Sequence, residues 1–102
     1  MTLDAVILDD DNYPEVQVAI GVDEHNTIIE SAQSMNLSTV ARIRDYYKDE
    51  EVRCCDLHQF LVELESLEKY YSGEYIIELI LALKRLFEHA QERGKSIHFI
   101  AD

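Results

Sequence analysis

The first third of the chain alternates short apolar runs with polar interruptions. Leu3–Leu8 is apolar at positions that would face both sides of a sheet, which is typical of a central strand. Val16–Val22 has an apolar residue at every second position and predicts a strand with one buried face. Thr27–Ala32 predicts a third strand, with a short helix as the alternative because its apolar residues also recur at helical spacing.

The middle of the chain predicts a less regular helix. Ser38–Lys48 carries apolar residues at the i, i+3 and i+7 spacing of one helix face, including Tyr47, and its first residue is a good helix cap. The acidic residues that follow end this helix. Val52–Cys55 is expected to be a short extended piece.

The second half predicts two longer amphipathic helices and a closing strand. A capping-box pattern that starts at Asp56 begins the first helix, and a Ser-Gly pair ends it after Tyr71. The second helix spans Glu74–Arg93 and stops at Gly94. Its apolar residues extend onto a second face, so it is either central to the core or part of an oligomer contact. Ser96–Ala101 is expected to be a strand beside the first one.

These elements predict one α+β domain. A chain of 102 residues matches the common size of single domains and can bury enough surface to fold without metal ions or disulfides. We expect residues 1–102 to form a single small mixed sheet of three to four strands. Two to three helices are expected to pack on one face of that sheet.

The charge changes this ordinary picture. The sequence has 21 acidic and 9 basic residues, a net charge of −12, and no Lys or Arg precedes Arg42. Such a field repels nucleic acids and anionic membranes and attracts basic proteins or cations. The alternative is that the acidic surface serves only solubility.

The sequence also indicates a cytoplasmic protein. We find no basic segment followed by an apolar stretch at the start of the chain, and no apolar run long enough to span a bilayer. The adjacent Cys54 and Cys55 are poorly placed to pair with each other, so we expect free thiols with at least one of them buried.

Three consecutive carboxylates follow the first strand. Asp9, Asp10 and Asp11 have three possible roles: a solvated loop, a docking site for a basic partner, or a Mg²⁺ or Ca²⁺ site. The glycine-containing pattern of a calcium loop is missing, so no metal ion or other cofactor is predicted. No zinc pattern, phosphate-binding loop or nucleophile constellation is found either. A small metal-dependent hydrolase that uses Asp9–Asp11 and His25 remains an alternative function.

Tyrosines stand beside further acidic residues. Tyrosine offers a large, rigid, amphipathic contact surface, and carboxylates orient and steer a basic partner. The tyrosines occur as two adjacent pairs, Tyr46-Tyr47 and Tyr70-Tyr71. The alternative is that one ring of each pair fills the core, while the other is exposed because neighbouring residues of a helix face different sides. Beyond the aspartate loop, the candidate partner-binding residues are Asp23, Glu24, Tyr46, Tyr47, Asp49, Glu50, Tyr70, Tyr71 and Glu74.

Three segments of the second half resemble a known family. Asp56–Gln59, Glu68–Glu74 and Phe87–Ile100 are similar to barstar-type ribonuclease inhibitors, and the resemblance covers about half of the chain. The resemblance implies a small acidic cytosolic protein that plugs the active site of a basic ribonuclease.

The resemblance carries over few contact residues. It implies Tyr70, Tyr71 and Glu74 as contacts with the enzyme. Where the family presents aspartates on its inhibitory helix, this chain has the largely apolar Tyr75–Ile80, in which only Glu78 is acidic. The N-terminal 50 residues have no counterpart in the family.

Charge and the lack of a catalytic pattern together predict a binding protein rather than an enzyme. The leading hypothesis is an immunity protein or antitoxin that inhibits a basic, nuclease-type bacterial toxin. The alternative from another class is a non-catalytic homodimeric module built on the helix Glu74–Arg93.

Overall fold

The computed structural model describes residues 2–71 and 76–101. Two 3-10 turns, η1 (Val40–Ile43) and η2 (Cys54–Asp56), lie on either side of β3. Within the described ranges the strands and helices follow the order β1 (Leu3–Leu8), β2 (Pro14–Ile20), α1 (Val22–Ser34), β3 (Glu50–Val52), α2 (Leu57–Tyr70), α3 (Ile76–Arg93) and β4 (Ile97–Ala101).

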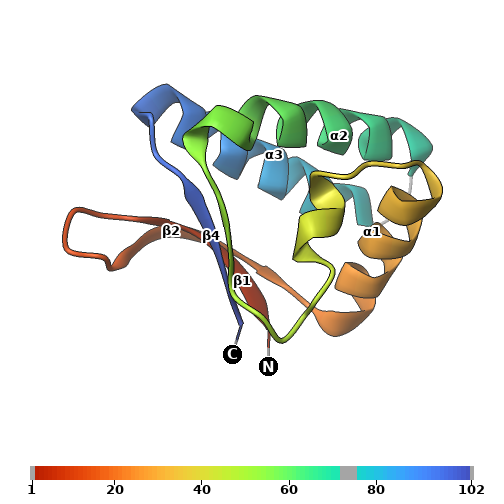
Figure 1. Cartoon of the computed structure of the whole chain (residues 1–102), viewed down its shortest axis with the longest axis horizontal. Coiled ribbons are helices and arrows are strands. Elements are labelled where there is room, and N and C mark those ends of the chain that lie inside the picture. The colour runs from red at the N-terminus through yellow and green to blue at the C-terminus, as the bar shows by residue number, and fades with distance from the viewer. Residues whose placement is uncertain (1, 72–75, 102) are drawn as a thin grey trace.

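The four strands form one sheet in the order β2-β1-β4-β3, and all neighbours are antiparallel. The α+β class, the number of strands and the position of the last strand beside the first are therefore confirmed, whereas the expected mixed sheet is wrong. The connections explain the difference. A hairpin joins β1 to β2, and the helical pair α2 and α3 brings the chain back so that β4 runs against both β1 and β3 (Figure 1).

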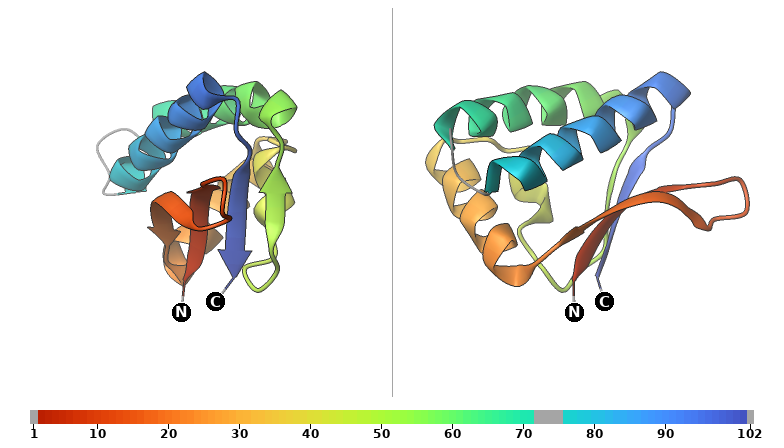
Figure 2. Two further views of the ribbon diagram at one scale, coloured as in Figure 1. Left: turned by 90° about the vertical axis from the view of Figure 1, so that its left-hand side faces the viewer. Right: turned by 180° about the vertical axis from the view of Figure 1, so that it is seen from behind.

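The helices cover one face of the sheet, as the sequence predicts, and leave the other face without a helix over it in the described part of the chain (Figure 2). The centre of the core is an aromatic cluster. Phe60 of α2 stacks on Phe87 of α3 with ring centroids 4.3 Å apart, and Phe99 of β4 lies 5.9 and 6.2 Å from them. All three rings are fully buried, so this cluster fixes the sheet to the helical layer.

The predicted third strand, Thr27–Ala32, is wrong because these residues lie inside α1. The buried apolar residues of this helix face the core at the spacing that the sequence offered as the alternative. Asp23 and Glu24 in its first turn interact favourably with the helix dipole. As a consequence β2 ends at Ile20 and not at Val22.

The prediction that β2 buries one face holds only at its C-terminal end. Ile20 is buried and Val18 is half-buried, whereas the other residues of the strand are exposed. The hairpin extends past the helices, so its outer half has nothing to pack against (Figure 1).

The predicted helix Ser38–Lys48 is reduced to the short turn η1. The buried side chains here are Val40, Ile43 and Tyr46. A spacing of three residues suits a 3-10 turn, in which residues i and i+3 lie above one another. Tyr46 lies beyond the end of η1, in the turn that follows it, and it is this tyrosine that is buried and not the predicted Tyr47.

The expected extended piece Val52–Cys55 is only partly extended. β3 ends at Val52, and Cys54 and Cys55 belong to the 3-10 turn η2. Both cysteines are exposed, so the expectation that at least one is buried is wrong.

Helix α2 agrees with its predicted span, and α3 ends at Arg93 as predicted, whereas its predicted start at Glu74 and the preceding Ser-Gly pair lie outside the described residues. Asp56 precedes α2, but its carboxylate makes no capping hydrogen bond to the helix. Gly94 ends α3 with φ of +64°, the left-handed conformation expected of a glycine at a helix stop.

The apolar residues of α3 belong mainly to the core of the monomer. Its apolar stripe is buried, and Ile77 and Leu81 on the second face are half-buried. None of the large hydrophobic side chains that are exposed in the described ranges lies on α3. The homodimer through Glu74–Arg93 stays a prediction. The exposed apolar face that motivated it is not found on the described part of α3. Across residues 2–71 and 76–101, no helix has the length and apolar character needed to cross a bilayer.

Candidate binding surfaces

The Asp9–Tyr13 hairpin is the first candidate surface. One carboxylate oxygen of Asp9 accepts hydrogen bonds from the backbone N–H groups of Asp11 and Tyr13, both at 2.9 Å. Asn12 adopts a left-handed φ of 64°, which completes the reversal. Asp9 thus shapes the turn, while Asp10 and Asp11 are exposed and form no ion pair within the described ranges.

Sequence reasoning missed the aromatic residue of this hairpin. Tyr13 is one of the exposed large hydrophobic side chains of the described residues, with 69% of its surface accessible. The sequence signal that could have found it is its position in a loop, between an aspartate run and the only proline of the chain. The hairpin therefore combines exposed carboxylates with an exposed ring.

Two cations fasten the base of the hairpin to the end of α3. Arg93 donates a hydrogen bond to the Glu15 carboxylate, which lowers the pKa of Glu15 and raises the pKa of Arg93. The ammonium group of Lys95 lies 3.7 Å from the same carboxylate and donates a hydrogen bond to the carbonyl oxygen of Leu8 at 3.1 Å. Of the hairpin carboxylates, Glu15 is therefore neutralised. Asp10 and Asp11 form no ion pair among the described residues, although the charge of Asp10 also helps to raise the pKa of Arg93.

The second candidate surface is an acidic end, formed by residues 21–25 and 44–50. Tyr46 joins the two segments: its hydroxyl donates to the carbonyl oxygen of Ile20 at 3.1 Å, and its ring packs edge-on against His25 at 5.0 Å. Tyr47 next to it is 69% exposed. Asp49 accepts a hydrogen bond from the N–H of Ala101 at 2.7 Å, so the acidic end lies beside the end of β4.

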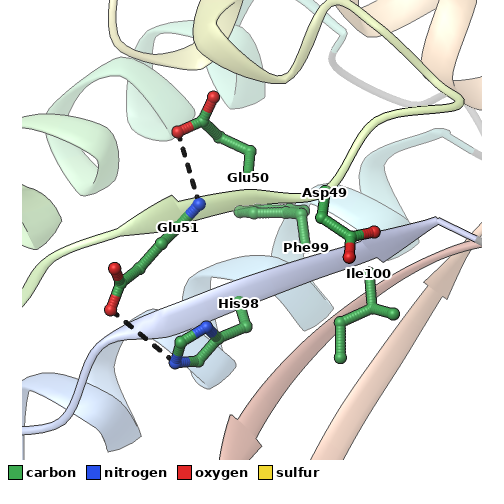
Figure 3. A pocket seen from close by; sticks show the side chains of 6 residues that line it. All are labelled: Asp49, Glu50, Glu51, His98, Phe99 and Ile100. Atoms are coloured by element: carbon green, nitrogen blue, oxygen red, sulfur yellow. Dashed lines mark hydrogen bonds and ion pairs between the residues drawn. The ribbon is translucent and has the colours of Figure 1, made fainter.

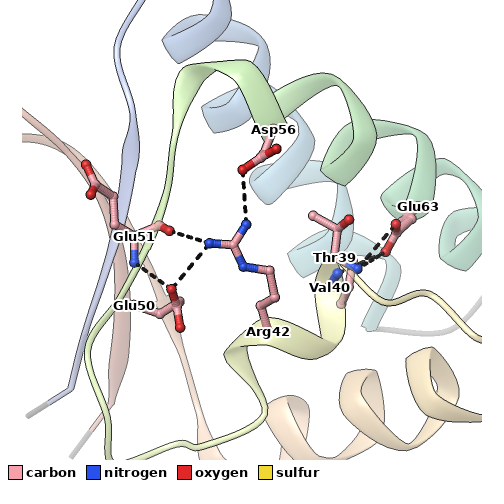
Figure 4. A network of polar contacts seen from close by, with 7 residues as sticks. All are labelled: Thr39, Val40, Arg42, Glu50, Glu51, Asp56 and Glu63. Atoms are coloured by element: carbon pink, nitrogen blue, oxygen red, sulfur yellow. Dashed lines mark hydrogen bonds and ion pairs between the residues drawn. The ribbon is translucent and has the colours of Figure 1, made fainter.

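The acidic end has a mixed charge. Asp23, Glu24, Asp45, Asp49 and Glu50 lie there together with Arg44 and Lys48. Arg42 also reaches it and bridges Glu50 at 3.4 Å and Asp56 at 3.2 Å (Figure 4). Five acids against two bases leave an excess of three negative charges in the two segments, and Arg42 offsets part of it.

The third group of predicted residues lies near the C-terminal end of α2. Tyr71 is buried, and its hydroxyl donates to the carbonyl oxygen of Thr27 at 3.2 Å and also contacts the Ser31 hydroxyl. Tyr70 is 65% exposed. Glu74 lies outside the described residues. In both tyrosine pairs one ring is thus buried and the other exposed, and the role of the exposed rings in binding a partner stays a prediction.

The candidate residues therefore do not form one surface. The hairpin and the acidic end lie at opposite ends of β2, and Tyr70 lies on the helical layer. An acidic pocket of about 370 Å³ at the edge of the sheet adds Glu51 and His98, which sequence reasoning did not place together (Figure 3). Their side chains lie 3.8 Å apart, because Glu51 and His98 are register partners in β3 and β4.

The described residues include no group of three or more His, Cys, Asp or Glu side chains that could hold a metal ion.

Comparisons with known proteins add no relative. No family model matches the sequence, and neither the curated proteins nor the solved structures gave a significant match. The resemblance to barstar-type inhibitors stays a prediction.

Proposed function

We propose that this protein is an acidic inhibitor, most concretely an immunity protein or antitoxin that blocks a basic, nuclease-type toxin by protein–protein interaction. The observation that supports this best is the hairpin. It projects from the body of the molecule and carries the unpaired Asp10 and Asp11 beside the exposed Tyr13 (Figure 1). A convex acidic element of this kind is complementary to a concave basic cleft.

The chemistry of the hairpin suits a phosphate-binding cleft. Nucleases hold phosphate groups with Lys and Arg side chains, and carboxylates accept strong charge-assisted hydrogen bonds from the same groups. Asp10 and Asp11 would occupy the positions of two phosphates. The ring of Tyr13 would be the anchor that loses its water on binding, since aromatic residues dominate the binding energy of interfaces.

The rigid base of the hairpin supports the same function. Arg93 and Lys95 fix Glu15 and the carbonyl of Leu8, so the approach of the tip is set before the partner arrives. Preorganised elements lose less conformational entropy on binding. The net charge of −12 would steer a basic partner toward the molecule.

The first test is to find the partner and then to neutralise the hairpin. The protein is used at low salt to capture basic proteins from its native host, and the products of neighbouring open reading frames are co-expressed with it. We expect the double variant Asp10→Asn/Asp11→Asn to weaken binding of the captured toxin by about a hundredfold, because each lost charged contact costs about 1.5 kcal/mol.

The matched control removes two charges elsewhere. Glu30→Gln/Glu65→Gln changes the net charge by the same amount at exposed positions on α1 and α2, away from the hairpin and from β2, and should weaken binding by only about threefold, through slower association. Equal losses in the two variants would show that only net charge matters. Retention of no basic protein would remove the proposal altogether.

A further inference from the structure

β2 has an unpaired edge. It is the outer strand of the sheet, and among the described strands only β1 pairs with it. The N–H and C=O groups along such an edge form a template for another strand. The irregular register at Ile7/Leu8 and the proline at position 14 protect only the end nearest the tip, so residues 15–20 remain able to pair.

A groove runs beside this edge. It is formed between β2 and α3, has a volume of about 340 Å³, and is lined by Val16, Val18, Ala82, Arg85, Leu86 and His89. Val16 is 38% exposed although it is on the face of β2 that points toward the helices. A strand added to β2 would place alternate side chains over these apolar residues.

Acidic residues lie at both ends of the same strand. Asp10 and Asp11 precede β2, and Asp23 and Glu24 follow it in the first turn of α1. Between them the exposed Arg85 and His89 line the groove. The edge is thus negative at its ends, with an apolar groove and an added positive charge at its middle.

We propose that the edge of β2 binds an extended segment of the partner by strand addition. The segment is about as long as β2, which has seven residues. It has apolar residues at alternate positions in the middle and Lys or Arg at both ends. Arg85 would repel a basic residue at the centre. The inference rests on the proposed function in one respect, namely that the partner is a basic protein.

A second copy of this chain suits the edge less well. Antiparallel pairing of two β2 strands would bring the hairpin carboxylates of one copy toward Asp23 and Glu24 of the other. Like charges that meet in this way oppose association. A basic segment makes favourable contacts at the same two places.

The test uses a synthetic peptide with two lysines at each end of a stretch that alternates valine and threonine. We expect it to bind and to slow amide hydrogen exchange in β2. Val16→Lys should weaken its binding about tenfold, which corresponds to about 1.4 kcal/mol. The control Val62→Lys changes a valine of similar exposure (41%) on α2 and should leave binding unchanged.

Three results would overturn the inference. The first is that a peptide of the same composition with its lysines at the centre binds as tightly as the test peptide. The others are that the peptide slows amide exchange only outside β2, or that Val16→Lys and Val62→Lys weaken its binding equally. Sedimentation that shows a dimer disrupted by Val16→Lys would assign the edge to a second copy and also contradict it. Peptide binding at β2 together with no effect of Asp10→Asn/Asp11→Asn on a toxin would refute the proposed function alone.

Discussion

Glu63 is a buried carboxylate that organises a loop. It is only 3% exposed and accepts hydrogen bonds from the N–H groups of Thr39 and Val40 at 3.0 and 2.9 Å (Figure 4). The side-chain amide of Gln59 donates a further hydrogen bond to it at 2.9 Å. Buried N–H groups need acceptors. Glu63 supplies them at the start of η1, where the first N–H groups of a helical turn have no backbone acceptor.

We expect Glu63→Ala to lower the free energy of unfolding by about 3 kcal/mol, because it leaves two backbone donors and one amide without their acceptor. Glu63→Gln keeps one acceptor oxygen and should cost about 1 kcal/mol. Urea unfolding measures both. The control Glu65→Ala, exposed on the same helix, should change the value by less than about 0.5 kcal/mol. A loss as large in the control would contradict this role.

The burial of the tyrosines could be predicted only in part from the sequence. The doublet Tyr46-Tyr47 indicates that one ring is buried and the other exposed. Which one is buried depends on whether the preceding turn is helical or 3-10. This segment is held by contacts from far along the chain, among them the hydrogen bonds to the Glu63 carboxylate 23 or more residues away in sequence, and periodicity within one segment does not contain such contacts.

At the scale of elements, the sequence predicts best where burial follows one simple period. β1, α2, α3 and β4 have strong patterns and lie where they were expected. β2 was recognised as a strand, but the exposure of most of its residues was not predicted. That exposure depends on how far the helices extend over the strand, which is decided only when the whole molecule packs. The third strand was assigned wrongly because six residues with two adjacent isoleucines fit both periods.

The attachment of the hairpin to α3 should depend on pH. The hydrogen bond from Arg93 lowers the pKa of Glu15 below its ordinary value of 4.5. A carboxyl group with a lowered pKa in the folded state stabilises that state above its unfolded pKa, and the contribution disappears as the pH falls through the folded pKa. Glu15→Gln should therefore lower the melting temperature slightly at pH 7, and the difference should vanish at pH values well below 4.5.

Thermal unfolding followed by circular dichroism from pH 7 down to pH 2.5 (about these limits, which bracket carboxylate titration) measures this difference. Glu92→Gln, which removes an exposed carboxylate near the same end of α3, is the control. A difference that persists unchanged at the lowest pH would show that the Glu15 side chain acts through packing and not through its charge.

At the scale of the whole molecule, composition indicates an acidic protein but not where the charge lies. Cations from distant segments neutralise Glu15, Glu50, Asp56 and Glu68. Of the acids that precede Arg42, Asp9–Asp11 and Glu15 lie at one end of β2, Asp23 and Glu24 lie at the other end, and Glu30 lies on α1, so they do not form a single acidic side. Net charge is a sum over residues, whereas its distribution depends on the topology β2-β1-β4-β3.

Association with a basic partner should be strongly salt-dependent. Raising the ionic strength from 0.01 to 1 M (about these values) shortens the screening length from about 30 to about 3 Å. We expect the association rate constant to fall by about a hundredfold and the dissociation rate constant to change little, because steering acts on the encounter. Stopped-flow mixing at several salt concentrations measures both. An association rate that does not change with salt would exclude electrostatic steering.

The antiparallel pairing of β1 with β4 has a practical consequence. Leu3 is the register partner of Ala101, so the first and last described residues of the sheet are neighbours, and Asp49 binds the backbone at the same place. A molecule tethered to a solid support through either terminus would be held in the same orientation. The support would then shield the end that carries Tyr47 and leave the aspartate tip accessible. A captured protein that binds tethered and free protein equally well would occupy the tip, whereas one that binds only the free protein would occupy the shielded end.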